Sequence, residues 1–584
     1  MSKAKCKGGR MTGGRALAEM LHVCGVGPLF GMGGFQMLPF YEGIRALGME
    51  HYLITDENNG ALSADAYARM TGRPAVCDGT TGPGAANLAT GLIESLNAGV
   101  PVIAVVGDTH RAHSWKNMTQ EARQMELLRP CVKELIRVEV TARVPELVRR
   151  AFAVATSGRP GPVLLDLPED VMHGDYEFAP EDFYVNERIL SAPSLRSRPA
   201  ACSVEAAAEM LAKAKRPMIL AGGGVHLSWA QETLNAFAKE FAIPVAYTMS
   251  GKGVVADTDE ISVGLFGRYS RIANDLMDKA DCLFVVGCKL GEIASKRYEL
   301  PKSGMPLIHL DIVPEEIDRW ARTTVGMWGD AKESLLDLAP VLRAKLSGRV
   351  SRPEYFKEIK KRKDDWYEIA RVRYESDESP VNMGRMMAEL NKFMPEDGVL
   401  IVDGGFAAHW GALLYDTKKA GRTFVANRGF ASIGYGLPAG IGVSLAARHG
   451  GLKGPVVSIT GDCGLNMSIG ELDTAMRAKT AFILIVVNNA ASGYVRSLQH
   501  AFYGEGHYQS SAITDTDFAA VARSYGCYGI RVEKPGDLQA ALKKAAKNKD
   551  KPTIVDVVVT RDPGQMLPAA DNRALAFRAG DRPV

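Results

Sequence analysis

The stretch from Val456 to Tyr494 constrains the fold of this chain more than any other part of its sequence. It begins with a short β-rich apolar run that ends in Gly461-Asp462-Cys463-Gly464. A helix-period segment, Ser468 to Lys479, and a second apolar run ending in Asn488-Asn489 follow. In a parallel α/β unit both strands end at the same carboxyl edge of the sheet, where such folds bind ligands. The pattern therefore predicts a strand-helix-strand unit that brings the aspartate and the second asparagine side by side.

This predicted edge offers the ligands that a magnesium ion prefers. Asp462 supplies a charged oxygen, Asn489 an amide oxygen and the turn through Ala491 a backbone carbonyl, which leaves positions for phosphate oxygens and water. Gly461 and Gly464 let backbone amides approach a diphosphate at the start of the following helix. The alternative is an ordinary strand-turn-helix with a solvent-facing aspartate, since short glycine motifs occur in many folds.

The length and composition of the chain indicate a globular protein of several domains. With 584 residues the chain has room for about three or four domains, and 46% hydrophobic with 23% charged residues is ordinary for such proteins. A formal net charge of +3 is close to neutral, so we expect neither nucleic acid nor a membrane as partner. The 9 scattered cysteines and an N-terminus without a long apolar run predict reduced thiols and a cytoplasmic location.

Strand and helix patterns alternate along the chain and divide it into three regions and a tail. We predict α/β domains with parallel sheets in residues 1–180, 199–348 and 378–560, and a polar tail in residues 561–584. A Pro/Ser/Arg-rich linker separates the first two regions, and a charged helical connector precedes the third. The turn Gly222-Gly223-Gly224 is a weak dinucleotide signal, because the full G-x-G-x-x-G spacing is missing.

The Val456 to Tyr494 stretch resembles the metal and diphosphate motif of thiamine diphosphate enzymes, in which Gly-Asp-Gly is followed by an apolar strand and Asn-Asn. The similarity is greatest to the acetohydroxyacid (acetolactate) synthase-like group, through Asn466-Met467 and Glu471-Leu472, and it covers nearly the whole chain. It implies three doubly wound parallel-sheet domains, namely pyrimidine-binding, central Rossmann-like and diphosphate-binding, with thiamine diphosphate and Mg²⁺ as cofactors. The residues it places at the diphosphate are Gly461, Asp462, Cys463, Gly464, Asn489, Ala491, Gly493 and Tyr494, of which Asp462, Asn489 and Ala491 would hold the metal.

The resemblance also implies an acid that hydrogen-bonds the pyrimidine ring of the cofactor and activates it. Glu57 matches this acid, at the end of a predicted strand and before a helix predicted from Ala61 to Thr71. A strand-end glutamate taken alone is more often a helix cap or a surface residue. Pro83 and Asn87 would lie against the pyrimidine, and Gln120 would reach toward the thiazolium and the substrate.

Two further segments resemble cofactor-binding loops of the same family. Gly405, Phe406 and Ala407 occupy the first diphosphate loop, where Phe406-Ala407 replaces the usual Gln-His pair, so that backbone amides would bind the phosphate. The Ala431 carbonyl would meet the exocyclic amine, and Ile433 would wedge the cofactor into its bent form. In the resembling family the activating acid and the metal ligands meet across a subunit interface, which implies a homodimer or homotetramer.

The expected reaction follows from the chemistry of the cofactor, whose C2 carbanion adds to a carbonyl and becomes an enamine after loss of carbon dioxide or cleavage of a C–C bond. The resemblance implies a carboligase like acetolactate synthase, which decarboxylates a 2-oxo acid and transfers the enamine to a carbonyl acceptor. Leu498 stands where the biosynthetic synthases carry a tryptophan that selects a larger acceptor. Their FAD segment is poorly matched at residues 288–291, which makes FAD doubtful, while a nucleotide in the middle domain stays open.

Two other functions remain open from the sequence. One is cleavage of an acyl-CoA, as by a 2-hydroxyacyl-CoA lyase or an oxalyl-CoA decarboxylase, with tail arginines holding its phosphates. The alternative for those arginines is a disordered polar terminus. The other function is a non-catalytic protein that binds a nucleotide or a partner on the same fold, against which the intact Glu57, Asp462 and Asn489 argue. The tail arginines are Arg561, Arg573, Arg578 and Arg582.

Overall fold

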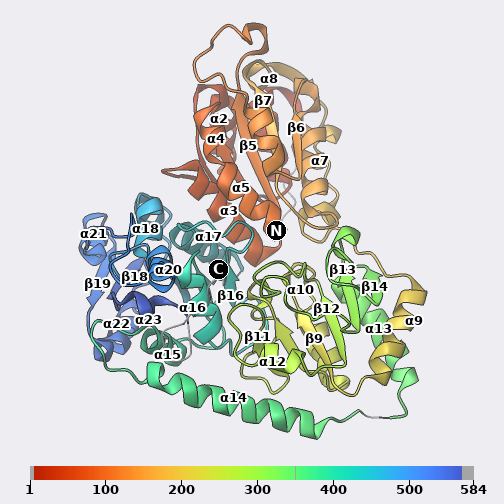
Figure 1. Cartoon of the computed structure of the whole chain (residues 1–584). Helices are drawn as coiled ribbons and strands as arrows, with labels where there is room; N and C mark the ends of the chain where they lie inside the picture. The colour runs from red at the N-terminus through yellow and green to blue at the C-terminus, as the bar shows by residue number, and fades with distance from the viewer. Residues whose placement is uncertain (1–5, 349, 451, 569–584) are drawn as a thin grey trace. The chain divides into compact units, whose positions relative to one another are not determined.

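The computed structural model describes residues 6–348, 350–450 and 452–568 of the chain (Figure 1). Within these residues lie three six-stranded sheets whose strand pairs are all parallel, and one two-stranded antiparallel ribbon. Helices pack on the sheets, so the predicted fold class of three doubly wound α/β domains is confirmed. The chain forms two compact units, one made of residues 1–195, 427–451 and 468–480 and the other of the remaining segments. The predicted domain boundaries stay predictions.

The first unit is built on a sheet with the strand order β3-β2-β4-β5-β7-β6. Its central strands are buried over their whole length, as expected for a parallel sheet covered on both faces. The strands of this unit, with the ribbon formed by β1 and β8, are β1 (Gly9–Thr12), β2 (Leu29–Met32), β3 (His51–Leu53), β4 (Ala75–Gly79), β5 (Val102–Asp108), β6 (Glu134–Arg137), β7 (Val163–Pro168) and β8 (Asp175–Phe178).

Helices cover both faces of this first sheet. α1 and α7 pack together on one face, and α3 packs with α5 and α17 on the other. α3 begins at Glu57 because the Asp56 side chain accepts a hydrogen bond from the Asn58 amide, and it ends where Gly72 adopts the left-handed conformation. The helices are α1 (Gly13–Val23), α2 (Leu38–Leu47), α3 (Glu57–Thr71), α4 (Pro83–Asn87), α5 (Ala89–Ala98), α6 (Gln124–Leu128), α7 (Val144–Thr156), α8 (Glu169–His173), α17 (Gly436–Gly450) and α19 (Glu471–Arg477).

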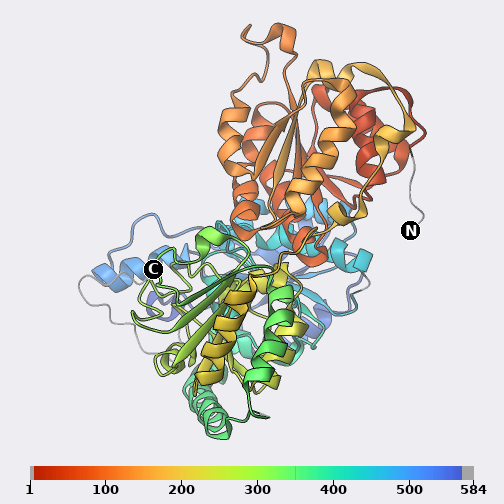
Figure 2. The ribbon, with the colours of Figure 1, turned by 90° about the vertical axis from the view of Figure 1, so that its right-hand side faces the viewer.

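The second unit contains the central sheet, with the strand order β11-β10-β9-β12-β13-β14. α9 and α13 lie side by side against it, as Figure 2 shows in yellow and green. Asp330 caps α13 by accepting hydrogen bonds from the amides of Lys332 and Glu333. The elements are β9 (Pro217–Ala221), β10 (Val245–Tyr247), β11 (Ser262–Leu265), β12 (Cys282–Val286), β13 (Leu307–Asp311), β14 (Val325–Trp328), α9 (Ala201–Lys213), α10 (Gly224–Leu227), α11 (Gln231–Glu240), α12 (Ala273–Met277) and α13 (Ala331–Lys345).

The third sheet, also in the second unit, has the order β16-β15-β17-β18-β20-β19 and places the two predicted strands of the motif next to each other at its centre. The predicted helix from Ser468 to Lys479 was wrong in its start, because α18 begins directly at Asp462 and a break at Ile469-Gly470 precedes α19. The elements are β15 (Val399–Val402), β16 (Phe424–Ala426), β17 (Val456–Gly461), β18 (Ile483–Asn488), β19 (Tyr528–Val532), β20 (Thr553–Val558), α15 (Met383–Phe393), α16 (Phe406–Leu414), α18 (Asp462–Ser468), α20 (Gly493–Tyr503), α21 (Phe518–Ser524), α22 (Leu538–Ala545) and α23 (Pro563–Met566).

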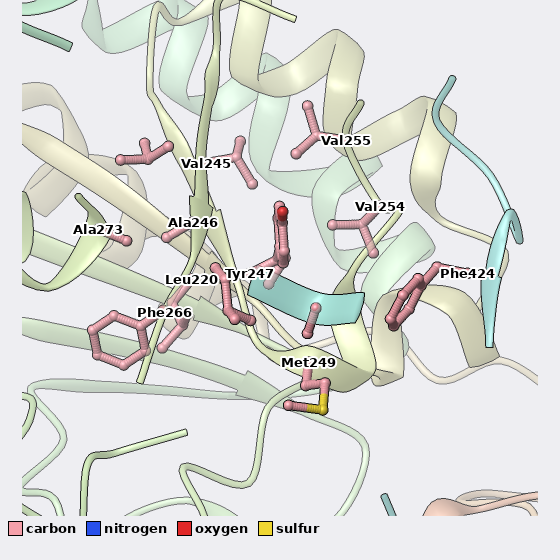
Figure 3. Close-up of a cluster of buried hydrophobic side chains, with 14 of the residues drawn as sticks. Leu220, Val245, Ala246, Tyr247, Met249, Val254, Val255, Phe266, Ala273 and Phe424 are labelled. Carbon is pink, nitrogen blue, oxygen red and sulfur yellow. The ribbon is translucent and has the colours of Figure 1, made fainter. Parts of the chain in front are cut away.

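The central and third sheets share one apolar core within the second unit. Figure 3 shows Tyr247 of β10 and Phe424 of β16 among buried aliphatic side chains. Beside them the buried Lys252 donates to Asp257 Oδ2 at 2.8 Å, and the Tyr247 hydroxyl donates to the other oxygen of the same carboxylate. Thr417, which precedes β16, donates to Asp257 through its amide and its hydroxyl, each at 2.9 Å. The buried Asp257 carboxylate is therefore paired with the Lys252 ammonium, as the cost of burying a charge requires. Its hydrogen bonds with Thr417 connect the central sheet to the third sheet.

The charged connector forms one helix, α14 (Pro353–Tyr374), of 22 residues. Lys360 and Lys361 pair with the aspartates four residues further on, each at 2.6 Å, whereas Ile359 and Trp366 are buried on the opposite face. Among the helices of the described ranges, none is long and apolar enough to cross a bilayer.

Candidate active site

Glu57 is a buried carboxylate at the first position of α3. The sequence placed it at the end of a strand with the helix starting at Ala61; that interpretation was wrong because the cap at Asp56 starts the helix four residues earlier. The side chain is 5% exposed, and Asn87 Nδ2 donates to Glu57 Oε2 at 2.9 Å. A negative charge at this helix start is favoured by the helix dipole. The structure thus brings together Glu57 and Asn87, two of the three residues that the resemblance assigned to the pyrimidine.

The glycine-rich turn before α4 lies directly against this carboxylate. Gly82 has φ 72°, which favours glycine, and Pro83 begins the helix. A Cβ at Gly84 would lie 2.9 Å from Glu57 Oε1, so a larger residue there would push the carboxylate away. A Cβ at Gly82 would overlap the Gln120 carbonyl oxygen, which places the backbone of that residue beside the turn. The Gln120 side chain is exposed, and its backbone has φ 66°.

Gln124 is a buried residue of this site that the sequence did not indicate. Its Oε1 accepts from the Gly82 amide at 3.0 Å, and its Nε2 donates to the Gly107 carbonyl at 2.8 Å and to Asp166 Oδ1 at 2.6 Å. Asp166 Oδ2 in turn accepts from Arg137 Nη1 at 2.7 Å. One amide side chain therefore connects the turn over Glu57 to the ends of β5 and β7. A glutamine inside a short polar segment carries no sequence signal of such a role.

The Asp166 carboxylate predicts a pH dependence of stability. Burial, and after it the charge of Asp108, raises the pKa of Asp166 to about 7. The folded state therefore keeps a proton that the unfolded state releases above about pH 4, so this carboxylate lowers stability progressively as the pH rises toward 7. Because an asparagine does not titrate, we expect the thermal midpoint of an Asp166→Asn variant, relative to that of the unchanged protein, to be higher at about pH 8 than at about pH 5.

Differential scanning fluorimetry at the two pH values measures this difference. Asp175→Asn, at a half-exposed position of the same unit, is the matched control and should leave the pH dependence unchanged. A midpoint difference between Asp166→Asn and the unchanged protein that is the same at both pH values would contradict the assignment.

Asp462 is the buried carboxylate at the other half of the predicted site, directly after β17. Its Oδ1 accepts from the Cys463 amide at 2.7 Å, and its Oδ2 accepts from the amides of Asn489 at 3.1 Å and Ala491 at 3.3 Å. Burial raises the pKa of Asp462 to about 6, and the amide hydrogen bonds oppose that rise. Asp462 and Asn489, which the sequence predicts as neighbours at the ends of β17 and β18, are therefore in direct contact.

The Asn489 side chain completes this edge of the third sheet. Its Oδ1 accepts from the Ala491 amide at 3.2 Å, while its Nδ2 faces the Met566 sulfur at 3.5 Å. Ala490, which stands between Asn489 and Ala491, has φ 54°, and the chain therefore turns sharply after the strand. α20 then begins with Gly493 and Tyr494. The residues that the resemblance placed at the diphosphate therefore lie in succession along this edge of the sheet.

The segment that resembles the first diphosphate loop of the family lies between β15 and α16 in the same unit. Asp403 is fully buried and accepts from the Gly404 amide and from the Thr460 hydroxyl, each at 2.6 Å, which ties the ends of β15 and β17 together. Gly405 has φ 66° and caps α16, whose first residues are Phe406 and Ala407. The Phe406 ring packs edge-on against Tyr494 at 4.8 Å between ring centroids. This side chain therefore faces the beginning of α20.

Ala431 and Ile433 lie in the turn before α17, in the first unit. Both are half-buried, and Ala431 has φ 61°, a left-handed conformation that is uncommon for a residue with a Cβ. Glu94 holds this turn through hydrogen bonds to its amides. The sequence did not indicate Glu94, because it lies inside a helix and far along the chain from the turn.

The residues at the end of β17 and β18 fit a magnesium ion with a diphosphate. A carboxylate, an amide oxygen and a nearby backbone carbonyl are hard oxygen ligands, and the three amides around Asp462 fix its orientation. A Cβ at Gly461 would meet no atom of the described chain within 4 Å, so the loop over the strand end is open. The buried acid at Glu57 likewise suits a ring nitrogen that must be hydrogen-bonded.

The tail arginines do not support a phosphate site in the part of the chain that the structure describes. Arg561 pairs with Asp515. Arg573, Arg578 and Arg582 lie outside the described residues, as does most of the predicted tail.

Three family models match the chain in succession. They are described as the N-terminal TPP binding domain of thiamine pyrophosphate enzymes (residues 11–127), their central domain (204–338) and their C-terminal TPP binding domain (403–557). Thiamine pyrophosphate (TPP) is another name for thiamine diphosphate.

Curated relatives align with this chain over nearly their whole length. A "Probable acetolactate synthase large subunit" of Methanocaldococcus jannaschii is 31% identical over 96% of this chain and 93% of its own. The "Acetolactate synthase isozyme 2 large subunit" of Escherichia coli is 29% identical over 94% of this chain and 96% of its own. The "Acetolactate synthase large subunit" of Corynebacterium glutamicum is 29% identical, over 98% and 91%.

Proposed function

The chain belongs to the thiamine pyrophosphate enzymes, and from this premise we propose that it is a carboligase like acetolactate synthase, which decarboxylates a 2-oxo acid and joins the remaining fragment to a carbonyl acceptor. The observation that carries the proposal is the buried Glu57 carboxylate, hydrogen-bonded by Asn87 and packed under the glycine turn. The full-length similarity to relatives named acetolactate synthase supports this reaction over cleavage of an acyl-CoA.

In this proposal Glu57 holds a proton at the pyrimidine ring nitrogen of the cofactor. When bound, the thiazolium supplies a nucleophilic carbon and accepts the electron pair left by the departing carbon dioxide. Asn87 orients Glu57 through its amide, and Gly84 leaves room for the carboxylate. Gln120, whose backbone lies beside Gly82, would reach the substrate from the exposed side of the turn.

The metal and diphosphate would be held by the edge of the third sheet. Asp462 and Asn489 would supply side-chain oxygens to Mg²⁺, and Ala491 its carbonyl. The amide at Gly405 and those at the start of α16 would bind phosphate oxygens without help from Phe406 or Ala407 side chains. We propose no role for FAD, since residues 288–291 match the FAD segment of the synthases poorly.

We propose further that the active protein is a homodimer or homotetramer in which Glu57 of one copy and Asp462 of another act on the same cofactor. The resemblance to the synthase group supports this arrangement. A cytoplasmic location is supported by the nine cysteines, all of which are free thiols.

Turnover of pyruvate tests the proposed reaction. The purified full chain is incubated with thiamine diphosphate, Mg²⁺ and pyruvate labelled with carbon-13, and the products are followed by carbon-13 NMR. We expect acetolactate together with carbon dioxide, and neither without the cofactor. Acetaldehyde as the sole organic product, or pyruvate left unchanged, would contradict the proposed reaction.

A further inference from the structure

Glu94 is a buried acid on α5 whose carboxylate accepts four hydrogen bonds. It is 1% exposed, and its Oε1 accepts from the Gly429 amide and from Arg69 Nη2, each at 2.8 Å. Its Oε2 accepts from the amides of Phe430 at 2.5 Å and Ala431 at 3.0 Å. Three consecutive backbone amides from a turn more than three hundred residues along the chain thus converge on one side chain. Hydrogen bonds to an ionised acceptor are stronger than those between neutral groups.

The backbone of the same turn lies in close contact with α5. A Cβ at Gly429 would overlap the Glu94 carbonyl oxygen and lie 2.9 Å from the Ala98 amide, so only glycine allows this approach. Asn427 Nδ2 donates to the Ser432 carbonyl at 2.5 Å and closes the turn from the other side. These contacts therefore hold the backbone from Asn427 to Ser432 against α5.

Ala431 is the residue whose conformation depends on this attachment. Its φ of 61° lies in the left-handed region, which an alanine adopts at an energetic cost and a glycine adopts freely. In that conformation the Ala431 amide donates a hydrogen bond to the Glu94 carboxylate. This hydrogen bond orients the peptide groups before and after Ala431. Strained backbone of this kind persists where the surroundings hold it.

A second set of contacts connects Glu94 to the helix that begins with Glu57. Arg69 of α3 donates to Glu94 and, through Nε, to Asp65 Oδ1 at 2.5 Å. The Tyr435 hydroxyl, at the end of the turn, donates to the same Asp65 oxygen at 3.0 Å. The buried Asp65 and Glu94 and the partly buried Arg69 thus join α3, α5 and the turn into one network.

We propose that Glu94 is a positioning residue for the cofactor, which sets the Ala431 carbonyl at the place where it accepts a hydrogen bond from the exocyclic amine. This role rests on the proposed function, because it assumes that thiamine diphosphate binds beside this turn. Glu94 touches neither cofactor nor substrate and acts only through the backbone of residues 429–431. Its loss therefore misplaces the amine and slows activation of the cofactor.

The exchange rate of the cofactor C2 proton with deuterium measures that activation without any substrate. At saturating thiamine diphosphate and Mg²⁺, we expect Glu94→Gln to slow the exchange about tenfold, because the amide replaces one acceptor oxygen by a donor that faces backbone N–H groups. Glu146→Gln, at an exposed position paired with Arg143 in the same unit, is the matched control and should leave the rate unchanged.

Ala431→Gly in the Glu94→Gln background separates positioning from simple destabilisation. Glycine adopts the left-handed conformation without strain, so the double variant should regain most of the lost exchange rate. Exchange in Glu94→Gln at the unaltered rate, or a loss that glycine does not restore, would overturn the role of Glu94.

Ala431→Val tests the same turn without changing Glu94, in case Glu94→Gln does not fold. A β-branched residue does not fit the left-handed conformation, so exchange should slow here as well. Exchange as fast as in the unaltered protein would overturn the proposal. Absence of cofactor-dependent exchange in the unaltered protein would instead contradict the proposed function, which makes the two failures distinguishable.

Discussion

Replacement of Glu57 by glutamine is expected to lower turnover of the 2-oxo acid by roughly 10²- to 10⁴-fold, the range typical for loss of a positioned acid or base. Glutamine has the same shape and still accepts the hydrogen bond from Asn87, so the site should keep its geometry. What it loses is the carboxyl group that would hold a proton at the pyrimidine nitrogen. Steady-state kinetics with pyruvate and the C2 exchange rate measure the two consequences separately.

The Glu57→Gln variant should still bind the cofactor. Its stabilisation by thiamine diphosphate with Mg²⁺ should equal that of the unaltered protein, because the diphosphate and metal are held elsewhere. Glu126→Gln, an exposed glutamate of the same unit, is the control for the chemical change. Turnover by Glu57→Gln within a few-fold of the unaltered protein would show that this carboxylate is not the activating acid.

Replacement of Asp462 by asparagine is expected to weaken binding of the magnesium diphosphate by roughly 100-fold or more, since a metal site loses its only charged ligand oxygen. The protein without cofactor should also lose some stability, because the asparagine Nδ2 would face a backbone N–H from which the Asp462 carboxylate accepts a hydrogen bond. Burial raises the pKa of Asp462 to about 6, so the removal of a buried charge offsets part of that loss. Titration calorimetry and the thermal midpoint without ligand measure the two effects.

Asp364→Asn on the exposed face of α14 is the control for Asp462→Asn. Cofactor affinity and magnesium dependence that stay unchanged in Asp462→Asn would contradict the metal site. The two inactive variants also test the proposed assembly: when Glu57→Gln and Asp462→Asn proteins are mixed and allowed to exchange subunits, part of the activity should return. Persistent inactivity in hybrids shown to have formed would mean that both residues act within one copy.

The sequence predicted the parts of this molecule that local patterns determine. Apolar runs that alternate with helix-period segments predicted the parallel sheets, and the paired strand ends predicted that Asp462 and Asn489 lie together. The resemblance added Glu57 and Asn87. No local pattern connects these two residues, but a hydrogen bond joins them in the fold. Helix starts were less well predicted, because a single capping side chain such as Asp56 shifts them by a turn.

The residues that the sequence missed act through tertiary contacts. Gln124 sits in a short polar segment, and its two hydrogen-bonding ends meet strand ends that are brought together only by the folded sheet. Glu94 lies in the middle of α5, where a glutamate normally indicates a solvated face. Its four donors come from a turn and a helix that no spacing along the chain connects with it. Buried polar groups of this kind become visible only when their partners are in place.

Stabilisation of the purified full chain by thiamine diphosphate is the most direct test of the central claim that this is a thiamine diphosphate enzyme. The thermal midpoint is measured with the cofactor alone, with Mg²⁺ alone and with both, for the unaltered chain and for Asp462→Asn. Ligand at about 100 times its dissociation constant stabilises the folded state by about 2.7 kcal/mol, so the midpoint should rise by a few degrees with both ligands together. The rise should be absent in Asp462→Asn. No rise in the unaltered chain, or an equal rise in both proteins, would contradict the account.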